Sequence, residues 1–175
     1  MDSNISLEES MVNQFRVGNG VDIHPLTKGR KLILAGIHVE HDYGCQGHSD
    51  GDVLTHSIMD SILGALGKGD IGDHFPSSNK HFKNANSMEL LQNIFYDYIE
   101  NRWNIVSIDS TIILQEPIIK PYINKMIDKV FDVISDETSG EHISIKATTT
   151  DHLGFIGEKK GVAALSTCLL IRKNG

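Results

Sequence analysis

Two short segments of the chain carry side chains of the types that bind zinc. Asp22 and His24 lie two residues apart in a stretch whose apolar residues alternate, so on a β-strand both side chains leave the same face. His56 follows in a segment of helical periodicity. One carboxylate and two imidazoles would suit a catalytic zinc, which keeps three protein ligands and an open fourth position. Each segment alone also has an ordinary structural interpretation without a metal.

Just before that helix, Gly47 and Gly51 enclose three polar residues, His48, Ser49 and Asp50, and Asp52 follows. The free N–H groups of a helix N-terminus attract anions, above all phosphate. Asp52, His56 and Asp60 follow at intervals of four, so one of the two carboxylates could hold the second ring N–H of His56. The alternative is a solvated helix face on which the histidine is incidental.

A third segment, from Lys146 to Asp151, contains three consecutive threonines. Their hydroxyl and backbone N–H groups, at the end of an expected strand, are suited to holding phosphate oxygens. Asp151 adds a hard oxygen ligand of the type that Mg²⁺ prefers beside phosphates. Threonine is also simply a good strand residue, so the run has a structural alternative.

Length and composition exclude several classes of protein. Its 175 residues fit one domain with a flexible tail. The formal net charge of −7 argues against nonspecific nucleic-acid binding, and no apolar run approaches the roughly 18–20 residues that a membrane span needs. Cys45 and Cys168 cannot form a disulfide framework. We therefore expect neither nucleic acid nor a membrane as a partner.

Hydrophobic periodicity predicts an α+β fold in which helices pack on one face of a mixed four-stranded sheet, beside a small hairpin. A loop is expected over 44–51, and a longer one over 69–86, a length typical of a lid or binding loop. A strand should begin at Phe15 and end at Pro25, and Ser87 should be a helix N-cap. The remaining expected elements are the hairpin 31–34 and 37–39, helices 52–66, 87–101 and 121–134, and strands 105–114, 143–147 and 162–171.

From about 16 to 171 the chain resembles the 2-C-methyl-D-erythritol 2,4-cyclodiphosphate synthase family of the non-mevalonate isoprenoid pathway. The resemblance rests on several motifs that occur in the family's order, which is far more specific than any one of them. They are Gly-x-Gly-x-Asp-x-His (Gly18 to His24), His-Ser-Asp-Gly-Asp (His48 to Asp52), Asp-Ile-Gly-x-x-Phe-Pro (Asp70 to Pro76), Lys-Ala-Thr-Thr-Thr (Lys146 to Thr150) and Leu-Gly-Phe (Leu153 to Phe155).

The resemblance implies a role for each motif. One Zn²⁺ per subunit would be held by Asp22, His24 and His56, and a second divalent cation, Mg²⁺ or Mn²⁺, by Asp151. His48 and Thr149 would stabilise the transition state, and Phe155 would face a central cavity. The implied substrate-binding residues are Asp22, His24, His48, Ser49, Asp70, Ile71, Gly72, Phe75, Pro76 and Asn79. The implied nucleotide-binding residues are Leu114, Gln115, Glu116, Pro117, Lys120, Thr148, Thr149, Thr150 and Asp151.

The implied reaction is the cyclisation of 4-diphosphocytidyl-2-C-methyl-D-erythritol 2-phosphate to 2-C-methyl-D-erythritol 2,4-cyclodiphosphate with release of CMP. The enzyme would be a phosphorus–oxygen lyase (EC 4.6.1.12), a homotrimer whose sheets meet and whose active sites lie between subunits. Two anionic groups must approach each other, so metals that cancel their repulsion fit an acidic protein. The alternatives are a zinc-dependent phosphohydrolase of a nucleotide ester and a non-catalytic, zinc-stabilised nucleotide-binding module.

Three positions depart from the family's usual pattern. Asp151 stands where many members have Glu, and its shorter arm could reach the second metal through water. Ile118 stands where a Lys often follows the Pro of the nucleotide loop, and Lys120 comes only later. Glu158 replaces a frequent Arg near the trimer axis, so isoprenoid-diphosphate binding there is not carried over.

The ends of the chain lead to two further expectations. Residues 1–13 are expected to be a disordered leader or processing remnant, and 14–175 a single cyclodiphosphate synthase domain. We expect a plastid-type organelle (apicoplast or chloroplast stroma) after removal of a targeting segment, with the bacterial cytoplasm as the alternative.

Overall fold

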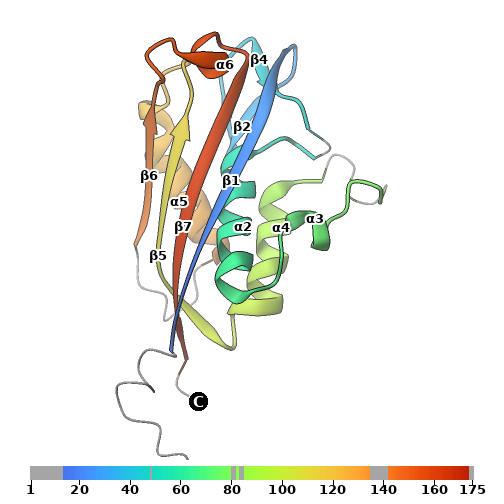
Figure 1. Cartoon of the computed structure of the whole chain (residues 1–175), viewed down its shortest axis with the longest axis vertical. Helices are drawn as coiled ribbons and strands as arrows, with labels where there is room; N and C mark the ends of the chain where they lie inside the picture. The colour runs from blue at the N-terminus through green and yellow to red at the C-terminus, as the bar shows by residue number, and fades with distance from the viewer. Residues whose placement is uncertain (1–13, 48, 80–81, 83–84, 135–141, 174–175) are drawn as a thin grey trace, which may run out of the picture.

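The structure, a computed structural model, describes residues 14–47, 49–79, 82, 85–134 and 142–173. Its centre is a five-stranded mixed sheet with the order β4-β1-β7-β5-β6 (Figure 1). All neighbouring strands are antiparallel except β5 and β6, which run parallel. The strands are β1 (Phe15–Lys28), β4 (Tyr43–Cys45), β5 (Trp103–Ile113), β6 (Ile143–Thr148) and β7 (Gly161–Arg172). The leader expected over 1–13 lies outside the described residues.

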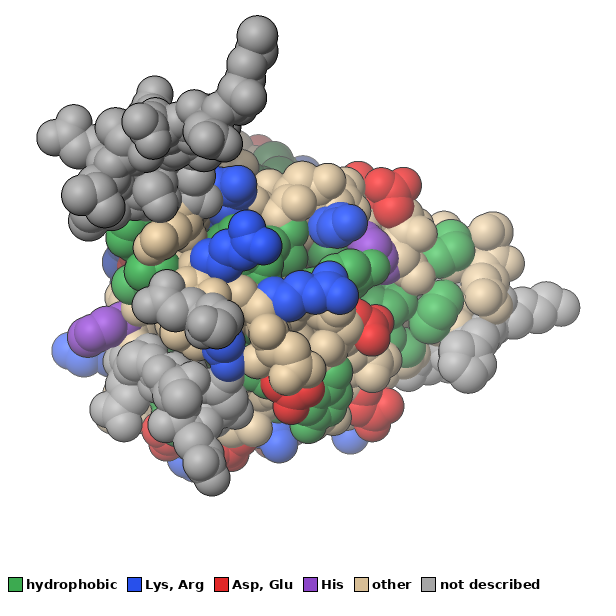
Figure 2. Space-filling view, turned by 90° about the horizontal axis from the view of Figure 1, so that it is seen from below, with side chains coloured by type: hydrophobic (Ala, Val, Ile, Leu, Met, Phe, Trp, Pro, Cys, Tyr) green, Lys and Arg blue, Asp and Glu red, His purple; other side chains and the backbone are tan. Residues whose placement is uncertain are grey.

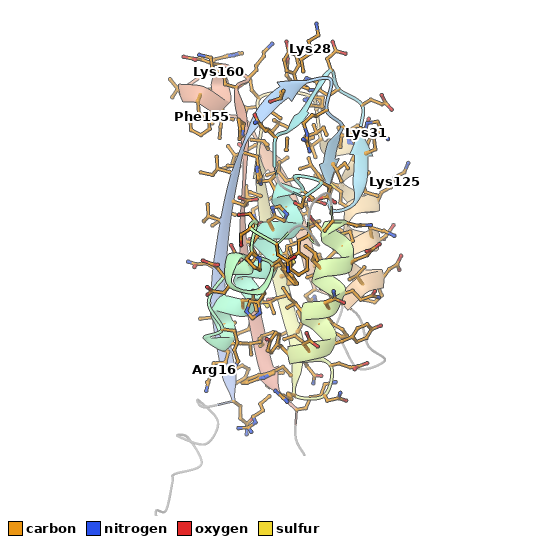
Figure 3. The ribbon with its side chains drawn as sticks, turned by 90° about the vertical axis from the view of Figure 1, so that its right-hand side faces the viewer. Arg16, Lys28, Lys31, Lys125, Phe155 and Lys160 are labelled. Atoms are coloured by element: carbon orange, nitrogen blue, oxygen red, sulfur yellow. The ribbon has the colours of Figure 1, made fainter. Side chains whose placement is uncertain are left out.

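Apart from the short helix Gly154–Gly157 at one end of the sheet, the helices and the hairpin lie on one side of it, as the sequence predicted (Figures 1 and 3). The hairpin consists of β2 (Leu32–Leu34) and β3 (Ile37–Val39), which pair with each other alone. The helices are α2 (Val53–Leu66), α3 (Ile71–His74), α4 (Ser87–Ile94), α5 (Ile123–Ile134) and α6 (Gly154–Gly157), with a π-helical turn at Phe95–Ile99 and a 3₁₀ turn at Lys120–Tyr122.

The sheet has five strands rather than the expected four, because part of the segment predicted as a loop pairs as β4. Strand β1 also continues past Pro25, where it was expected to end. Pro25 is the last residue of β1 that pairs with β7, and from Leu26 the strand pairs with β4 instead. The missing N–H of proline therefore falls where the strand changes its neighbour. The three residues of β4 are too few to show an alternating apolar pattern, so the sequence did not predict this strand.

Glycines on β1 allow α2 to lie directly on the sheet. A Cβ atom at Gly18 would come within 2.2 Å of the Ser61 carbonyl oxygen, and one at Gly20 within 2.2 Å of the Ser57 carbonyl oxygen. Because residues two apart share a face of a strand, Asp22 continues the row of Gly18 and Gly20 towards the helix. The close approach of α2 therefore places the side chain of Asp22 beside the helix that carries His56.

The ends of the helices mostly follow the sequence prediction. Asp52 caps α2 by accepting a hydrogen bond from Thr55 N at 3.0 Å, and the helix ends at Gly67, whose φ is 63°. The cap of α4 is different, because Asn86 rather than Ser87 accepts the bond from Met88 N, at 3.0 Å. The side chain of Ser87 is thereby available for another partner. None of the described helices is long and apolar enough to cross a membrane.

The side of the sheet that faces away from the helices carries exposed apolar side chains. Val17 is 68% exposed and Val21 56%, and both belong to the row of β1 that points away from α2. Leu165 on β7, directly beside Val21 in the register, is also exposed. Neighbouring exposed apolar side chains of this kind mark surfaces that contact another protein.

Basic side chains gather at the end of the molecule where β1 begins and β7 ends, the end that faces the viewer in Figure 2. Arg16 lies on β1, and its guanidinium carbon is 5.7 Å from the centre of the Trp103 ring. The register of β5 and β7 brings Arg172 to the same end. In a chain of net charge −7, this cluster is a local exception.

Candidate active site

Asp22, His24 and His56 come together as the sequence predicted. Asp22 Oδ2 lies 2.9 Å from His24 Nε2 and 2.8 Å from His56 Nδ1, and the two ring nitrogens are 3.4 Å apart. Tetrahedral zinc with bonds of about 2.0–2.1 Å holds its ligand atoms roughly 3.3 Å from one another. Within the described part of the chain, these residues form the one cluster of His, Cys, Asp and Glu compact enough for an ion. Their ligand atoms therefore fit a divalent metal.

The charges of the triad favour binding of a cation. Burial by itself raises the pKa of Asp22, but hydrogen bonds from His24 and His56 outweigh it and hold that pKa well below its usual range. The bond to Asp22 in turn raises the pKa of His24, while burial opposes this rise. Asp22 is thus ionised. Its carboxylate oxygen and one nitrogen of each imidazole surround the point that a divalent ion would occupy.

The unpredicted strand β4 holds one ligand in place. His24 Nδ1 lies 2.8 Å from the carbonyl oxygen of Gln46, the residue that follows β4, and Gln46 N donates to the carbonyl of Pro25 at 2.9 Å. A backbone carbonyl only accepts hydrogen bonds, so Nδ1 carries a proton, and Nε2, which bonds to Asp22, is the nitrogen that would coordinate a metal in place of that bond. This arrangement is the usual support for a metal-binding histidine. Nothing in the spacing of the sequence pointed to Gln46.

The second ring nitrogen of His56 is not held by a carboxylate of its own helix, contrary to the expectation. Asp52 accepts hydrogen bonds from Ala35 N at 2.9 Å and Gly36 N at 2.7 Å, and Asp60 accepts one from Ile71 N at 2.8 Å. These carboxylates therefore fix the hairpin turn and the start of α3. His56 Nε2 instead lies 2.9 Å from Ser87 Oγ, a contact between segments far apart in the sequence.

A cavity of about 240 Å³ adjoins the triad and is called the metal-side cavity here. Four of the predicted substrate-binding residues besides the triad line it, namely Ser49, Ile71, Gly72 and Phe75. Asp70 instead caps α3 by accepting hydrogen bonds from Gly72 N and Asp73 N, and neither Asp70 nor Pro76 nor Asn79 is in the lining. His48 lies outside the described residues. The lining residues that sequence analysis missed are Met59, Ser77, Phe82 and Leu90.

A second cavity, of about 440 Å³, lies beside the ends of β5 and β6 and is called the threonine-side cavity. It brings together six of the predicted nucleotide-binding residues, namely Leu114, Gln115, Pro117, Lys120, Thr148 and Thr149. Glu116, Thr150 and Asp151 are not in its lining. The lining residues that were not predicted are Ile118, Ile119, Ile123, Ile145, Lys146 and Ala147.

Two lysines line this cavity, although no Lys directly follows Pro117. Lys120 belongs to the turn that precedes α5, and Lys146 belongs to β6. Lys146 is paired with Asp109 across the parallel strands, with Nζ 2.5 Å from Oδ2. The Asp109 carboxylate therefore partly neutralises Lys146, and Lys120 is the cation better suited to an incoming phosphate.

Asp151, the predicted ligand of a second metal, is exposed and adopts a positive φ of 50°. Its Oδ1 lies 3.4 Å from the hydroxyl of Thr149. The other threonine hydroxyls bond to backbone carbonyls close in sequence, Thr148 to Thr149 O and Thr150 to Leu153 O. The hydroxyl of Thr149 is thus the one directed at a carboxylate.

Phe155 lies on α6, at the end of the molecule opposite Arg16, and projects to the open side of the sheet (Figure 3). Its side chain is half exposed. The acidic residue Glu158 pairs with Lys160 at 2.6 Å, and Lys159 pairs with Glu116 at 2.7 Å. Both lysines near Phe155 are therefore paired with carboxylates.

The two cavities lie apart within one chain. Asp22 and His24 are on β1, whereas Thr148 ends β6, and the sheet order places β7 and β5 between these strands. Three steps between neighbouring strands correspond to about 14 Å. One chain therefore does not place the triad and the threonines around a single small cavity.

Comparison with known proteins agrees with the motifs. Residues 15–171 match the profile of the YgbB family. A protein of Clostridioides difficile (strain 630) named 2-C-methyl-D-erythritol 2,4-cyclodiphosphate synthase is 49% identical over 156 residues, 89% of this chain and 96% of that protein. A protein of the same name from Synechococcus elongatus is 45% identical over 161 residues, 92% of this chain and 99% of that protein.

Solved structures show the same fold. The structure described as the IspF (Plasmodium falciparum) CDP complex is 36% identical, with a TM-score of 0.78 over 93% of this chain and 99% of that one. The bifunctional IspDF from Campylobacter jejuni is 41% identical, with a TM-score of 0.85 over 91% of this chain. This chain spans 43% of that longer one. From the match of fold, motifs and sequence, the chain belongs to the YgbB family of 2-C-methyl-D-erythritol 2,4-cyclodiphosphate synthases.

Proposed function

We propose that this protein cyclises 4-diphosphocytidyl-2-C-methyl-D-erythritol 2-phosphate to 2-C-methyl-D-erythritol 2,4-cyclodiphosphate and releases CMP, as a phosphorus–oxygen lyase (EC 4.6.1.12) of isoprenoid biosynthesis. An oxygen of the 2-phosphate forms a bond to the β-phosphorus, and the bond from that phosphorus to the CMP phosphate breaks. No water is consumed. The observation that carries this proposal is the preformed Asp22–His24–His56 triad beside a cavity, in a chain 49% identical to a curated synthase.

The triad would hold Zn²⁺, which supplies a positive charge that polarises a diphosphate oxygen and offsets repulsion between the reacting anions. The protein's own part is to place those anions. Ser49 faces the metal-side cavity and would donate a hydrogen bond to a phosphate oxygen, beside His48. Ile71, Gly72 and Phe75 would enclose the methylerythritol carbons, because their side of the cavity is mostly apolar.

Asp70, Pro76 and Asn79 complete the proposed substrate set from outside the lining of the metal-side cavity. Asp70 would act chiefly by fixing α3, since its carboxylate accepts hydrogen bonds from Gly72 N at 2.8 Å and Asp73 N at 3.2 Å. The loop that contains Pro76 and Asn79 follows this helix directly. These residues would therefore shape the side of the pocket that receives the sugar alcohol.

The threonine-side cavity would bind the cytidine nucleotide. Leu114, Gln115 and Pro117 offer apolar contact and an amide for the base, and Lys120 and Thr148 offer donors for the phosphates. The structural relative from Plasmodium falciparum is described as a CDP complex, which supports a cytidine ligand. Glu116, Thr150 and Asp151 would contribute from the rim, Asp151 by holding Mg²⁺ or Mn²⁺. Thr149 would stabilise the charge that develops on the transferred phosphoryl group.

A homotrimer with its active sites between subunits would unite the two cavities. Within one chain they are separated by two strands of the sheet, yet the proposed substrate carries its reacting phosphate and its nucleotide on one molecule. The exposed apolar row that includes Val17, Val21 and Leu165 offers the surface on which copies would meet. Phe155, on the same open side, would then face the central axis.

A zinc-dependent phosphohydrolase of a nucleotide ester is the alternative reaction, because the same triad could activate water. Incubation of the purified protein with substrate in ¹⁸O-labelled water separates the two. Cyclisation gives the cyclic diphosphate and CMP without label, whereas hydrolysis places label in a product. Metal analysis of the same sample should find one zinc per chain. A labelled linear product would overturn the cyclase proposal, and CMP binding without turnover would favour a binding module.

Residues 14–175 would form one cyclodiphosphate synthase domain, since the family match spans 15–171. We propose a plastid-type organelle as the location of the protein, with the bacterial cytoplasm as the alternative. Relatives come from bacteria, cyanobacteria among them, and a structural relative from Plasmodium falciparum, and these sources agree with either compartment. Immunolocalisation in the source cell distinguishes them.

A further inference from the structure

Two serine hydroxyls approach the ring nitrogen of His56 that faces away from the triad. His56 Nε2 lies 2.9 Å from Ser87 Oγ and 3.1 Å from Ser49 Oγ. The surroundings of the two serines differ. Ser87 is fully buried as the first residue of α4, whereas Ser49 is partly exposed and lines the metal-side cavity. The two hydroxyls can therefore have different tasks.

The hydroxyl proton of Ser87 is already committed to Asp50. Ser87 Oγ lies 2.5 Å from Asp50 Oδ1, and Ser87 N donates to Asp50 Oδ2 at 2.9 Å. Asp50 is itself fixed, since its N–H donates to the carbonyl of Ala85 at 3.2 Å. An ionised carboxylate only accepts hydrogen bonds, so Ser87 donates to Asp50 and presents its lone pairs to His56.

This direction of bonding determines which nitrogen of His56 can bind a metal. A neutral imidazole has one N–H and one lone pair. With Ser87 acting as acceptor, Nε2 carries the proton of the neutral ring, so Nδ1, 2.8 Å from Asp22 Oδ2 and 3.4 Å from His24 Nε2, is the nitrogen whose lone pair a metal would take in place of the hydrogen bond to Asp22. A metal ligand must be unprotonated at the coordinating atom. The chain from Asp50 through Ser87 therefore prepares His56 for coordination.

We propose that Ser87, oriented by Asp50, is the positioning residue that fixes the ring and proton of His56 for metal binding, and that the hydroxyl of Ser49 stays available to the substrate. This inference rests on the proposed metal site and extends it to a residue outside the triad. His24 is supported in the same way, but by the backbone carbonyl of Gln46. Ser87 is thus the support that a side-chain substitution can remove.

The test measures metal affinity rather than turnover. Wild-type, Ser87→Ala and Ser49→Ala proteins are stripped of metal and titrated with Zn²⁺ against a competing chelator. Loss of such a support for a ligand costs roughly 10- to 100-fold in metal affinity, so Ser87→Ala should bind zinc at least about tenfold more weakly. Ser49→Ala removes the same group from the same nitrogen and is the matched control. We expect its zinc affinity to equal that of the wild type.

Two further measurements separate positioning from a general structural role. Two-bond ¹H–¹⁵N spectra of zinc-loaded wild-type protein should show the remaining ring proton of His56 on Nε2, protected from exchange, and Ser87→Ala should lose that protection. Ser87→Thr retains a hydroxyl and should recover the affinity. If Ser87→Ala does not fold, Asp50→Ala serves instead, because it leaves the hydroxyl without its acceptor and should also weaken zinc binding.

The outcomes are distinct. Zinc affinity unchanged in folded Ser87→Ala, or lowered equally in Ser49→Ala, overturns the role of Ser87 while leaving the metal site intact. A wild-type protein that binds no divalent ion overturns the metal site and this inference together. Weakened binding in Ser87→Ala alone, with recovery in Ser87→Thr, supports it.

Discussion

The metal-side cavity and the threonine-side cavity differ in how their polar groups are held. The ligands of the triad are fixed by contacts from distant segments, such as Gln46 O on His24 and Ser87 Oγ on His56. The threonine hydroxyls bond only to atoms within three residues, as Thr150 does to Leu153 O. Thr148 and Thr149 are also exposed. The first cavity is thus preorganised within one chain, whereas the second is open.

This difference indicates where assembly matters. A site that must hold a cation benefits from rigid ligands, because misplaced ligands lose both affinity and geometry. A nucleotide site that opens to the surface can be completed by its ligand and by a neighbouring subunit. Substitutions at the two cavities should therefore act on different steps of the reaction.

The largest effect is expected at the triad. Asp22→Asn preserves shape but removes the negative charge and one ligand atom, so metal binding should fail. Because the metal supplies several kcal/mol of transition-state stabilisation, turnover should fall on the order of 10³-fold or more. His56→Ala should behave alike. Metal analysis and a coupled CMP-release assay measure this, with circular dichroism as the check on folding. Wild-type rates from metal-free protein would contradict the prediction.

At the threonine-side cavity we expect a smaller loss. Thr149→Ala removes one donor to the developing charge, so kcat should fall by about 10²-fold, with a smaller change in CMP affinity. The matched variant Thr150→Ala removes a hydroxyl that bonds to Leu153 O, and kcat should change less. Steady-state kinetics and calorimetric CMP titration give both values. A loss of CMP binding with normal kcat would make Thr149 a nucleotide contact only.

A substitution on the open side of the sheet tests whether the threonine-side cavity needs a neighbouring subunit. Leu165→Glu places a carboxylate in the proposed interface, and burying an unpaired charge costs several kcal/mol. Light scattering should then show monomers, and turnover should fall although zinc content is unchanged. Lys125→Glu, on the helical side of the molecule (Figure 3), introduces a carboxylate elsewhere with a larger change in net charge and should still assemble normally. An assembled Leu165→Glu protein would remove this surface from the interface.

Binding of the second metal should depend on the carboxylate of Asp151. Asp151→Ala removes a hard oxygen ligand at the rim, so the Mg²⁺ concentration for half-maximal activity should rise several-fold while zinc content stays constant. Asp151→Glu retains the ligand and should need no more Mg²⁺ than the wild type. An identical Mg²⁺ titration for the alanine variant would assign the second metal to other residues.

The smallest effect on turnover is expected from substitution of Cys168, whose thiol lies on the covered side of β7. Burial raises the pKa of Cys168 from its ordinary value of 9.0 to about 12, so the folded state retains a proton that the unfolded chain releases above pH 9. Stability is therefore unaffected well below that pH and declines as pH rises towards 12, by about 1 kcal/mol between pH 8 and 10. Urea unfolding of wild type and Cys168→Ala should differ in this slope. Equal slopes would contradict it.

Local patterns predicted most of the elements, because periodicity and capping act over a few residues. Helix α2 was expected from Asp52 to Leu66 and runs from Val53 to Leu66. Strand β4 was missed, since its pairing with the far end of β1 is a long-range event. The cap of α4 was assigned to Ser87 rather than Asn86 because both residue types are good caps, and only packing shows that Ser87 bonds to Asp50.

The amino-acid sequence alone determined the residue types of the triad and the two-residue spacing of Asp22 and His24 on one strand. It also determined the glycines that let α2 approach. These features depend only on the alternation of a strand and on the absence of a Cβ atom. Tertiary structure alone decided which groups hold the outer nitrogens of His24 and His56, and that the two cavities are separated by β7 and β5. The reason is that hydrogen bonds between distant segments depend on how the whole chain packs, which no local spacing encodes.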